Sequence, residues 1–233
     1  MRLDKYLALS REGTRSEVKD HIRKGSVSVN GSVIKDPAAH IKESDTVMIG
    51  GRAVTYKKHV YYMLNKPAGV VSATEDDTEK TVIDLFPEEL RKGLFPVGRL
   101  DKDSVGLLII TDDGAFAHEL ASPKNHVDKR YLIHTDLPLD EADADAFSKG
   151  ITLSDDTVFK PAVLDISEED KTEAIVTISE GKYHQVKRMI ASRNKKVLYL
   201  KRIAIGNLKL DPDLEEGRYR ELTDEEIRAA EMS

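Results

Sequence analysis

The chain has 233 residues, of which 39% are hydrophobic and 33% are charged, and its formal net charge at pH 7 is -6. It contains no cysteine, which excludes disulfides, thiolate catalysis and cysteine-based zinc or iron–sulfur sites. No apolar run approaches the roughly 20 residues that cross a bilayer, and the charged amino terminus lacks the apolar stretch of a secretory signal. We therefore expect a cytoplasmic protein with no membrane segment, and a monomer of this size can bury its own core.

The charges are distributed unevenly along the chain. Residues 1–59 carry 12 basic and 7 acidic side chains, whereas residues 60–233 carry 24 and 35. Within the second part, residues 181–202 hold eight basic side chains and no acidic one. Because salt screens charges beyond about 8 Å under physiological conditions, a phosphate backbone senses such local patches rather than the net charge. The acidic total therefore does not exclude nucleic-acid binding.

The first quarter of the chain predicts two short helices and a small sheet. The capping-box spacing from Thr14 to Glu17 predicts that the second helix begins there, and Gly25 is suited to end it. The pair Asn30-Gly31 between alternating valines is typical of a type I′ hairpin turn. Together these signals indicate a compact helical pair that leads into strands.

This segment resembles a known RNA-binding module. Its start, RLDKYLA, and the later stretch KGSVSVNG are similar to the module named after ribosomal small-subunit protein four. The resemblance implies that the helical pair faces structured RNA through five basic side chains: Arg2, Arg11, Arg15, Arg23 and Lys24. A polar stretch at residues 56–59 then precedes a strand pattern, so we place an RNA-binding domain at 1–59 and a larger domain at 60–233.

The larger domain alternates strand and helix patterns without a fixed repeat. Strands are predicted over 60–65, 105–111, 129–135, 161–167, 173–179 and 197–205, and helices over 79–86, 114–121, 139–149 and 183–193. A second capping-box spacing, from Thr223 to Glu226, predicts a short terminal helix. The fold class is α+β: a small αα-β domain followed by a larger domain with a mixed or antiparallel sheet and flanking helices.

Three short islands in the larger domain concentrate residues suited to chemistry. They run from Lys66 to Ser72, from Gly98 to Ser104 and from Glu180 to Met189. Each island alone is explained by a turn or by a basic helix end. In this order and spacing, however, they resemble the pseudouridine synthases, and specifically the branch that modifies single uridines of ribosomal RNA. Positions 184–188 are closer to the small-subunit enzymes than to their large-subunit relatives, which tend to carry arginine at position 187.

The resemblance implies an isomerisation of uridine to pseudouridine that calls for no cofactor and no metal. The bond from ribose to ring nitrogen breaks, the uracil turns while held, and a bond from ribose to ring carbon forms. The family's ionised carboxylate corresponds to Asp101, whose role as nucleophile, electrostatic stabiliser or base stays open. Lys187 is the candidate cation that favours the charged form of this acid. Tyr131 corresponds to a pocket tyrosine that stacks on uracil and assists removal of the ring proton.

The target uridine must leave folded RNA before a carboxylate can reach its ribose, at a cost of roughly a few kcal/mol. Arg99 is placed to hold the rearranged backbone or to fill the vacated stack. Lys66 and Arg188 are predicted to contact phosphates. The implied partner is ribosomal RNA, expected within a small-subunit assembly intermediate.

Other interpretations stay open at this point. Residues 101–104 also resemble the nucleophile loop of haloacid-dehalogenase phosphatases, and Asp103 would be the second acid of a retaining glycosidase. A large-subunit synthase or a non-catalytic RNA-binding assembly factor shares the basic patches, although the latter has no need of the three predicted catalytic residues together. Residues 192–195 depart from the family pattern, which usually has a glycine turn there, and this leaves the phosphate contacts of the helix end open.

Overall fold

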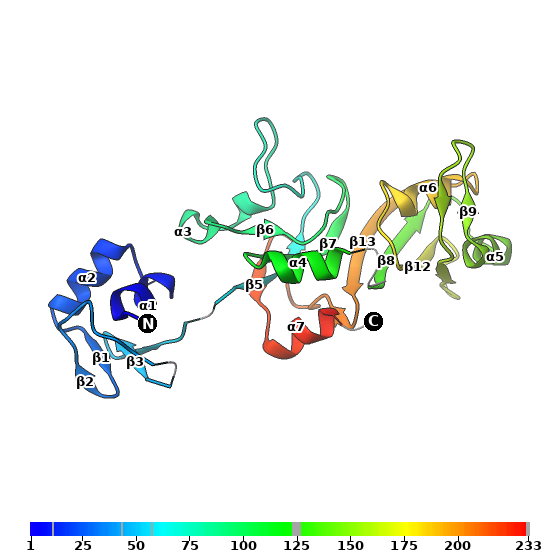
Figure 1. Cartoon of the computed structure of the whole chain (residues 1–233). Helices are drawn as coiled ribbons and strands as arrows, with labels where there is room; N and C mark the ends of the chain where they lie inside the picture. Colours follow the sequence, from blue (N-terminus) through cyan, green and yellow to red (C-terminus); the bar gives the residue numbers. More distant parts are fainter. Residues whose placement is uncertain (11, 43, 57, 123–126, 232–233) are drawn as a thin grey trace. The chain divides into compact units, whose positions relative to one another are not determined.

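The computed structural model describes residues 1–10, 12–42, 44–56, 58–122 and 127–231. The chain divides into two compact units, Met1–His59 and Val60–Ser233 (Figure 1). The first unit buries one apolar cluster and the second buries two, so each unit has a core of its own. No helix in the described part of the chain is long and apolar enough to cross a membrane.

The first unit combines two helices with a small antiparallel sheet. The helices are α1 (Leu3–Leu9) and α2 (Arg15–Arg23). The strands, in their order across the sheet, are β2 (Ser32–Val33), β1 (Val27–Val29), β3 (Val47–Ile49) and β4 (Arg52–Val54). Apolar side chains of both helices and of the strands are buried in one cluster, as the helical and alternating patterns predict.

Local signals account for the boundaries of these elements. Thr14 caps α2: its side-chain oxygen accepts from the Glu17 amide, and the Glu17 carboxylate accepts from the Thr14 amide at 2.7 Å. The helix ends before Gly25, which has a positive φ of 76°. Between β1 and β2, Asn30 and Gly31 both have positive φ, as a type I′ turn requires. The predicted hairpin is therefore confirmed.

The second unit is built on a nine-stranded mixed sheet. Across it the strand order is β11 (Val163–Ile166), β12 (Glu173–Ile178), β8 (Lys129–Thr135), β13 (Val197–Ile205), β7 (Val105–Thr111), β5 (Tyr61–Lys66) and β15 (Tyr219–Glu221). Strand β14 (Leu208–Lys209) pairs with β13, and β6 (Phe95–Pro96) pairs with β7. All pairs are antiparallel except β13 with β7. This architecture confirms the α+β class.

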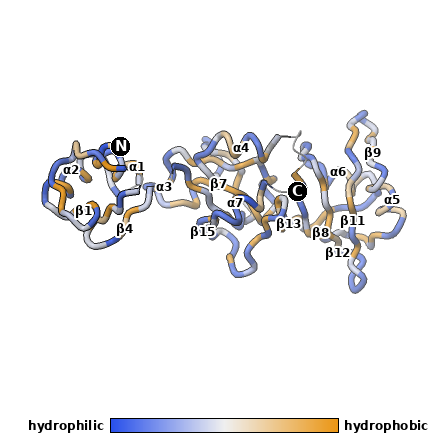
Figure 2. Tube along the Cα trace, turned by 60° about the horizontal axis from the view of Figure 1, so that its bottom comes forward, coloured by the Kyte–Doolittle hydropathy of each residue, from blue (hydrophilic) through white to orange (hydrophobic). Residues whose placement is uncertain are grey.

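Helices pack on both faces of this sheet. The helices of the second unit are α3 (Glu88–Arg91), α4 (Gly114–Ala121), α5 (Glu141–Lys149), α6 (Gln185–Ala191) and α7 (Asp224–Glu231), with a 3-10 turn at Ile83–Leu85. A separate hairpin of β9 (Ile151–Thr152) and β10 (Val158–Phe159) follows α5. Figure 2 shows hydrophobic stretches along the strands and hydrophilic loops between them, which is the distribution expected of a sheet covered by helices.

Strand β7 is buried on both faces and divides the core of the second unit. Leu107 and Ile109 belong to the cluster that includes side chains of α4 and α7. Leu108 and Ile110 belong to the other cluster, which includes side chains of α5 and α6. Because successive side chains on a strand point to opposite faces, one continuous apolar run supplies both clusters.

A glycine permits the parallel pairing of β7 with β13. Gly106 pairs with Arg202, and its φ is +102°. A Cβ atom at this position would lie 2.3 Å from the Arg202 carbonyl oxygen and 2.9 Å from its amide nitrogen. Only glycine allows the two backbones to come this close. This contact joins the first residues of β7 to β13, the strand that follows α6.

The helix predicted over 79–86 is wrong. The structure has only the 3-10 turn at Ile83–Leu85 in this segment. Asp84 Oδ2 accepts from the amide and the hydroxyl of Thr81, which fixes a tight turn. Phe86 is extended, with φ of -94° and ψ of 149°, because the residue before a proline avoids helical backbone angles, and Pro87 follows.

Candidate active site

A lysine of α6 and an aspartate from a distant loop form an ion pair in the second unit. Lys187 Nζ lies 2.8 Å from Oδ2 of Asp101, which belongs to the loop between β6 and β7. The same ammonium lies 2.6 Å from Oδ1 of Asp103. His184 Nε2 lies 3.4 Å from the other carboxylate oxygen of Asp101. Two nitrogen groups, the Lys187 ammonium and the His184 ring, therefore contact this one carboxylate.

The charges at this cluster stabilise one another. Partial burial opposes the charged form of Lys187, but the hydrogen bonds that it donates to Asp101 and Asp103 outweigh this effect and raise the pKa of the lysine. The hydrogen bond from Lys187 likewise lowers the pKa of Asp103. The ammonium is therefore charged at neutral pH and gives Asp101 a fixed cationic partner.

Asp101 lines a small pocket that is open to solvent. Tyr131, which is buried in the middle of β8, also lines it, as does the exposed Arg99. The other lining residues are Leu100, Ser104, Ile178, Gly181, Lys182, His184, Gln185, Val186 and Leu200. The pocket thus combines apolar walls, one aromatic ring and one ion-paired carboxylate.

The first island supports the loop of Asp101 from beneath. Lys66, at the end of β5, is fully buried, and its Nζ donates to the carbonyl oxygens of Ser104 at 2.8 Å and Pro67 at 3.0 Å. The prediction that Lys66 contacts an RNA phosphate is therefore wrong, because no part of its side chain reaches solvent. Burial lowers the pKa of Lys66 to about 8, although Asp103 and Asp101 act in the opposite direction.

Further hydrogen bonds hold both sides of Asp101. The Gly69 amide donates to the Lys102 carbonyl at 2.8 Å. The hydroxyl of Ser72 donates to the Leu100 carbonyl at 2.8 Å and accepts from the Leu100 amide at 3.0 Å. The residues directly before and after Asp101 are thus both tied to the first island. The sequence did not predict that Lys66 and Ser72 support the Asp101 loop, because this role is evident only from their hydrogen bonds to residues 100–104.

The third island forms a tight turn before α6. Gln185 Nε2 donates to the buried Glu180 carboxylate at 2.9 Å, and Gln185 Oε1 accepts from the Lys182 amide at 3.0 Å. His184 precedes the helix with a positive φ of 50°. The helix therefore begins at Gln185, whereas the sequence predicted a start at position 183. Its first turn directs Lys187 toward Asp101.

The two other basic residues of the second unit that were predicted to contact RNA, Arg99 and Arg188, differ in their surroundings. Arg99 is exposed at the pocket and is available to an RNA backbone. Arg188 instead points to the β9–β10 hairpin: its Nη2 lies 2.5 Å from the Asp155 carboxylate, and its guanidinium lies 5.5 Å from the Phe159 ring centre. A phosphate would have to replace Asp155 to bind this side chain.

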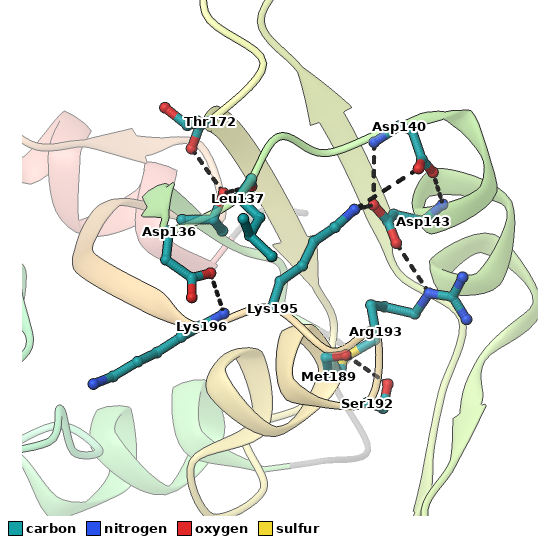
Figure 3. A network of polar contacts seen from close by, with 11 residues as sticks. Asp136, Leu137, Asp140, Asp143, Thr172, Met189, Ser192, Arg193, Lys195 and Lys196 are labelled. Atoms are coloured by element: carbon teal, nitrogen blue, oxygen red, sulfur yellow. Dashed lines mark hydrogen bonds and ion pairs between the residues drawn. The ribbon is translucent and has the colours of Figure 1, made fainter.

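Two basic residues after α6 have structural partners (Figure 3). Arg193 Nε donates to the buried Asp143 carboxylate at 3.0 Å, and Lys195 Nζ contacts its other oxygen. Asp143 lies in the first turn of α5, so this cluster joins α5 to the end of α6. Asn194 has a φ of 58°, in the left-handed region that asparagine and glycine adopt most readily.

In the first unit the predicted RNA contacts are mostly exposed. Arg15, Arg23 and Lys24 are exposed in α2 and at its end. Arg2 forms a bidentate pair with Asp4, at 2.8 and 3.0 Å. Arg11 lies outside the described residues.

Comparisons with known proteins identify the family. A model described as RNA pseudouridylate synthase matches residues 60–192, and a model of the S4 domain matches residues 1–47. The chain therefore belongs to the RNA pseudouridylate synthases and carries an amino-terminal S4 domain, which makes it an enzyme of RNA modification.

Similar proteins extend over nearly the whole chain. The RNA pseudouridine synthase YtzG of Bacillus subtilis is 45% identical, with 97% of each chain covered. Ribosomal small subunit pseudouridine synthase A is 40% identical in Haemophilus influenzae, with 97% and 98% covered, and 39% identical in Escherichia coli, with 97% and 98% covered. A crystal structure of a pseudouridylate synthase superposes with a TM-score of 0.71 at 40% identity and covers 99% of both chains.

Proposed function

We propose that this enzyme converts one uridine of small-subunit ribosomal RNA to pseudouridine at the pocket lined by Asp101 and Tyr131, where Lys187 is the ion-pair partner of Asp101. The observation that carries the assignment of the site is the ion pair of Asp101 and Lys187, 2.8 Å apart at a pocket wall. An ionised carboxylate with a fixed cation, next to a buried aromatic ring, suits a reaction at the sugar of a flipped nucleotide.

In the proposed reaction Asp101 acts at the ribose of the everted uridine. It attacks the sugar, stabilises positive charge that develops there, or removes a ribose proton while the bond to the ring nitrogen breaks. Lys187 donates a hydrogen bond to this carboxylate at 2.8 Å and is its cationic partner at the reacting sugar. The composition of the nucleotide does not change, so the reaction balances without a co-substrate.

The pocket walls hold the uracil while it turns. Tyr131 stacks on the ring and assists removal of the proton from the ring carbon that forms the new bond to ribose. Leu200 and Val186 supply apolar walls of the same pocket. Arg99 holds the RNA backbone next to the everted nucleotide, because it is exposed at the pocket and close in sequence to Asp101.

The choice of small-subunit RNA is supported by the relatives named ribosomal small subunit pseudouridine synthase A. The S4 domain supplies a second contact with structured RNA through the exposed basic side chains of α2. We further propose that the enzyme acts as a monomer on a small-subunit assembly intermediate, and hence in the cytoplasm, where ribosomes are assembled.

Tritium release from RNA labelled at ring carbon five of uridine tests the proposed site. The wild type is expected to release tritium from small-subunit RNA, and Asp101→Asn is expected to bind the RNA without releasing tritium. Release by Asp101→Asn at the wild-type rate would overturn the assignment. Pseudouridine mapping in cells that lack the protein tests the substrate, since loss of a site in large-subunit RNA alone would contradict the proposal.

A further inference from the structure

Tyr183 is a large aromatic residue that is exposed beside the pocket and has no part in the proposed reaction. Its exposed fraction is 69%, although the adjoining residues Lys182 and His184 line the pocket. It lies in the turn before α6, within the 181–202 stretch that contains eight basic residues and no acidic one. Exposed aromatic rings are the groups on which proteins stack the bases of single-stranded or opened RNA.

One face of the Tyr183 ring is covered and leads toward the carboxylate. The ring stacks on His184, with 3.8 Å between the ring centres and 18° between the planes. His184 Nε2 in turn lies 3.4 Å from Oδ1 of Asp101. Two stacked rings therefore connect the solvent side to the carboxylate, and the outer face of Tyr183 is the end of this stack.

The turn presents this ring in a fixed position. The Gln185 amide donates to the Lys182 carbonyl at 3.1 Å, and the Lys182 amide donates back to the Gln185 side chain at 3.0 Å. Gln185 is itself fixed by the buried Glu180 carboxylate. Because the turn on which the ring is carried is already ordered, a base that stacks on it binds with little further loss of conformational freedom.

We infer that Tyr183 is a stacking platform for an RNA base next to the uridine that enters the pocket. The inference rests on the proposed function, because it takes the polymer at the pocket to be RNA. Eviction of a uridine leaves its neighbours without a stacking partner, and an exposed ring two residues from the start of α6 replaces that partner. The platform binds any base by its flat face, so it contributes affinity and positioning more than sequence choice.

The test compares Tyr183→Ala, Tyr183→Leu and Tyr183→Phe in the full chain. The probe is a short oligouridylate with one 2-aminopurine, whose fluorescence falls when it stacks on an aromatic ring. Tyr183→Ala and Tyr183→Leu are expected to weaken binding about 5- to 100-fold and to abolish the quenching, as loss of one base–aromatic stack does. Tyr183→Phe, which keeps the ring, is expected to restore both. In tritium release on small-subunit RNA, the KM of Tyr183→Ala is expected to rise much more than its kcat falls.

Val163→Ala is the matched control, since Val163 is a similarly exposed apolar residue on the edge strand β11. Equal binding by wild type and Tyr183→Ala would overturn the inference, as would full binding by Tyr183→Leu. If the wild type releases no tritium from ribosomal RNA while quenching still requires the ring, the proposed function fails and the platform stands. If the wild type releases tritium but quenching is the same in the wild type and in Tyr183→Ala, the stacking role of Tyr183 is excluded and the proposed function is retained.

Discussion

At Lys187 one ammonium group contacts two carboxylates, and these contacts differ in their surroundings. Asp101 is three-quarters covered and lies at the pocket, whereas the Asp103 side chain is 75% exposed. Ion pairs between exposed groups contribute little, because water screens them and long side chains lose freedom on pairing. We therefore expect the proposed reaction to depend on the contact with Asp101 more than on the contact with Asp103.

This difference predicts that removal of Lys187, the partner of Asp101, lowers activity more than removal of Asp103, the second partner of Lys187. Lys187→Gln is expected to lower kcat by about 100-fold or more, the usual effect of removing a fixed electrostatic partner in an active site. Asp103→Asn, the matched control in the same loop, is expected to lower it by about fivefold at most. Single-turnover tritium release measures both. Equal losses in the two variants would show that the exposed carboxylate is as important as the buried contact.

Lys66 is a buried cation that lies close to the same loop but acts on its backbone. Its ammonium donates to the carbonyl oxygens of Pro67, Lys102 and Ser104. Among the hydrogen bonds of the described residues, none joins this ammonium to a carboxylate. Its side chain was expected at the surface, because lysine in a basic island usually is. Burial of this kind depends on which strands cover the position, which the order of residues along the chain does not reveal.

The stability of the protein should depend on pH through Lys66. In the folded chain its pKa is lowered to about 8 from 10.5, chiefly by burial, so between these values the unfolded chain holds more protons. Stability contributed by this residue therefore rises with pH across that interval. Between about pH 7.5 and about pH 9.5, the free energy of unfolding of the wild type is expected to rise by about 2 kcal/mol relative to Lys66→Met.

Urea unfolding of both proteins at the two pH values measures this change, and taking the difference removes the titration of all other groups. An unchanged difference would mean that the Lys66 ammonium releases its proton at its ordinary pKa. The sign is the useful part of the test, since a lysine stabilised by a carboxylate partner would give the opposite trend.

At the scale of elements, α5 and the end of α6 are joined by one buried carboxylate. The Asp143 side chain is 2% exposed and forms ion pairs with both Arg193 and Lys195 (Figure 3). Burial opposes its charge, but the hydrogen bonds from the two basic side chains lower its pKa. Since α6 also carries Lys187, this cluster anchors the far end of the helix that positions the ion pair.

Asp143→Asn is expected to destabilise the second unit by about 3 kcal/mol, because it removes the buried anion that pairs with the half-buried Arg193 and Lys195. Asp145→Asn on the same helix removes an exposed pair with Lys149 and is expected to change stability by about 0.5 kcal/mol at most. Thermal or urea unfolding distinguishes the two. Similar values for both variants would mean that the buried cluster contributes no more than a surface pair.

The long elements of the sheet could be predicted from periodicity, and the strands over 105–111, 129–135 and 197–205 agree with the structure at both ends. Two-residue strands such as β9 and β10 carry no periodic signal and were not predicted. The helix over 79–86 failed because local side-chain hydrogen bonds and a following proline favoured a turn. At the candidate site, the pairing of Asp101 with Lys187 was expected, but the buried support by Lys66 and Ser72 depends on contacts distant in sequence.

At the scale of the whole molecule, the two units divide the charge between them. Residues 1–59 are net basic, and residues 60–233 are net acidic with a local basic stretch around α6. Only nearby charges act on a phosphate backbone at physiological salt, so both basic regions can bind RNA despite the acidic total. Affinity is therefore expected to come from both units and chemistry from the second.

Replacing Arg15, Arg23 and Lys24 together by glutamine is expected to weaken RNA binding and to reduce the slope of log affinity against log salt by about two to three. Each lost phosphate contact lowers that slope by about one. The kcat at saturating RNA is expected to stay unchanged, because these residues belong to the first unit. Lys149→Gln, which removes an exposed charge from α5, serves as the control. An unchanged slope in the triple variant would exclude α2 from the RNA contacts.

The ion pair of Asp101 and Lys187 joins residues that are 86 positions apart, and Gly106 meets Arg202 still later in the chain. During translation the S4 domain emerges first and can fold while the rest is being made, since domains fold as units from the amino end. A nascent chain thus acquires its RNA-binding part before its carboxylate has a counter-ion. We therefore expect half-synthesised molecules to bind RNA before they can modify it, because Lys187 and the last strands of the sheet leave the ribosome after the S4 domain.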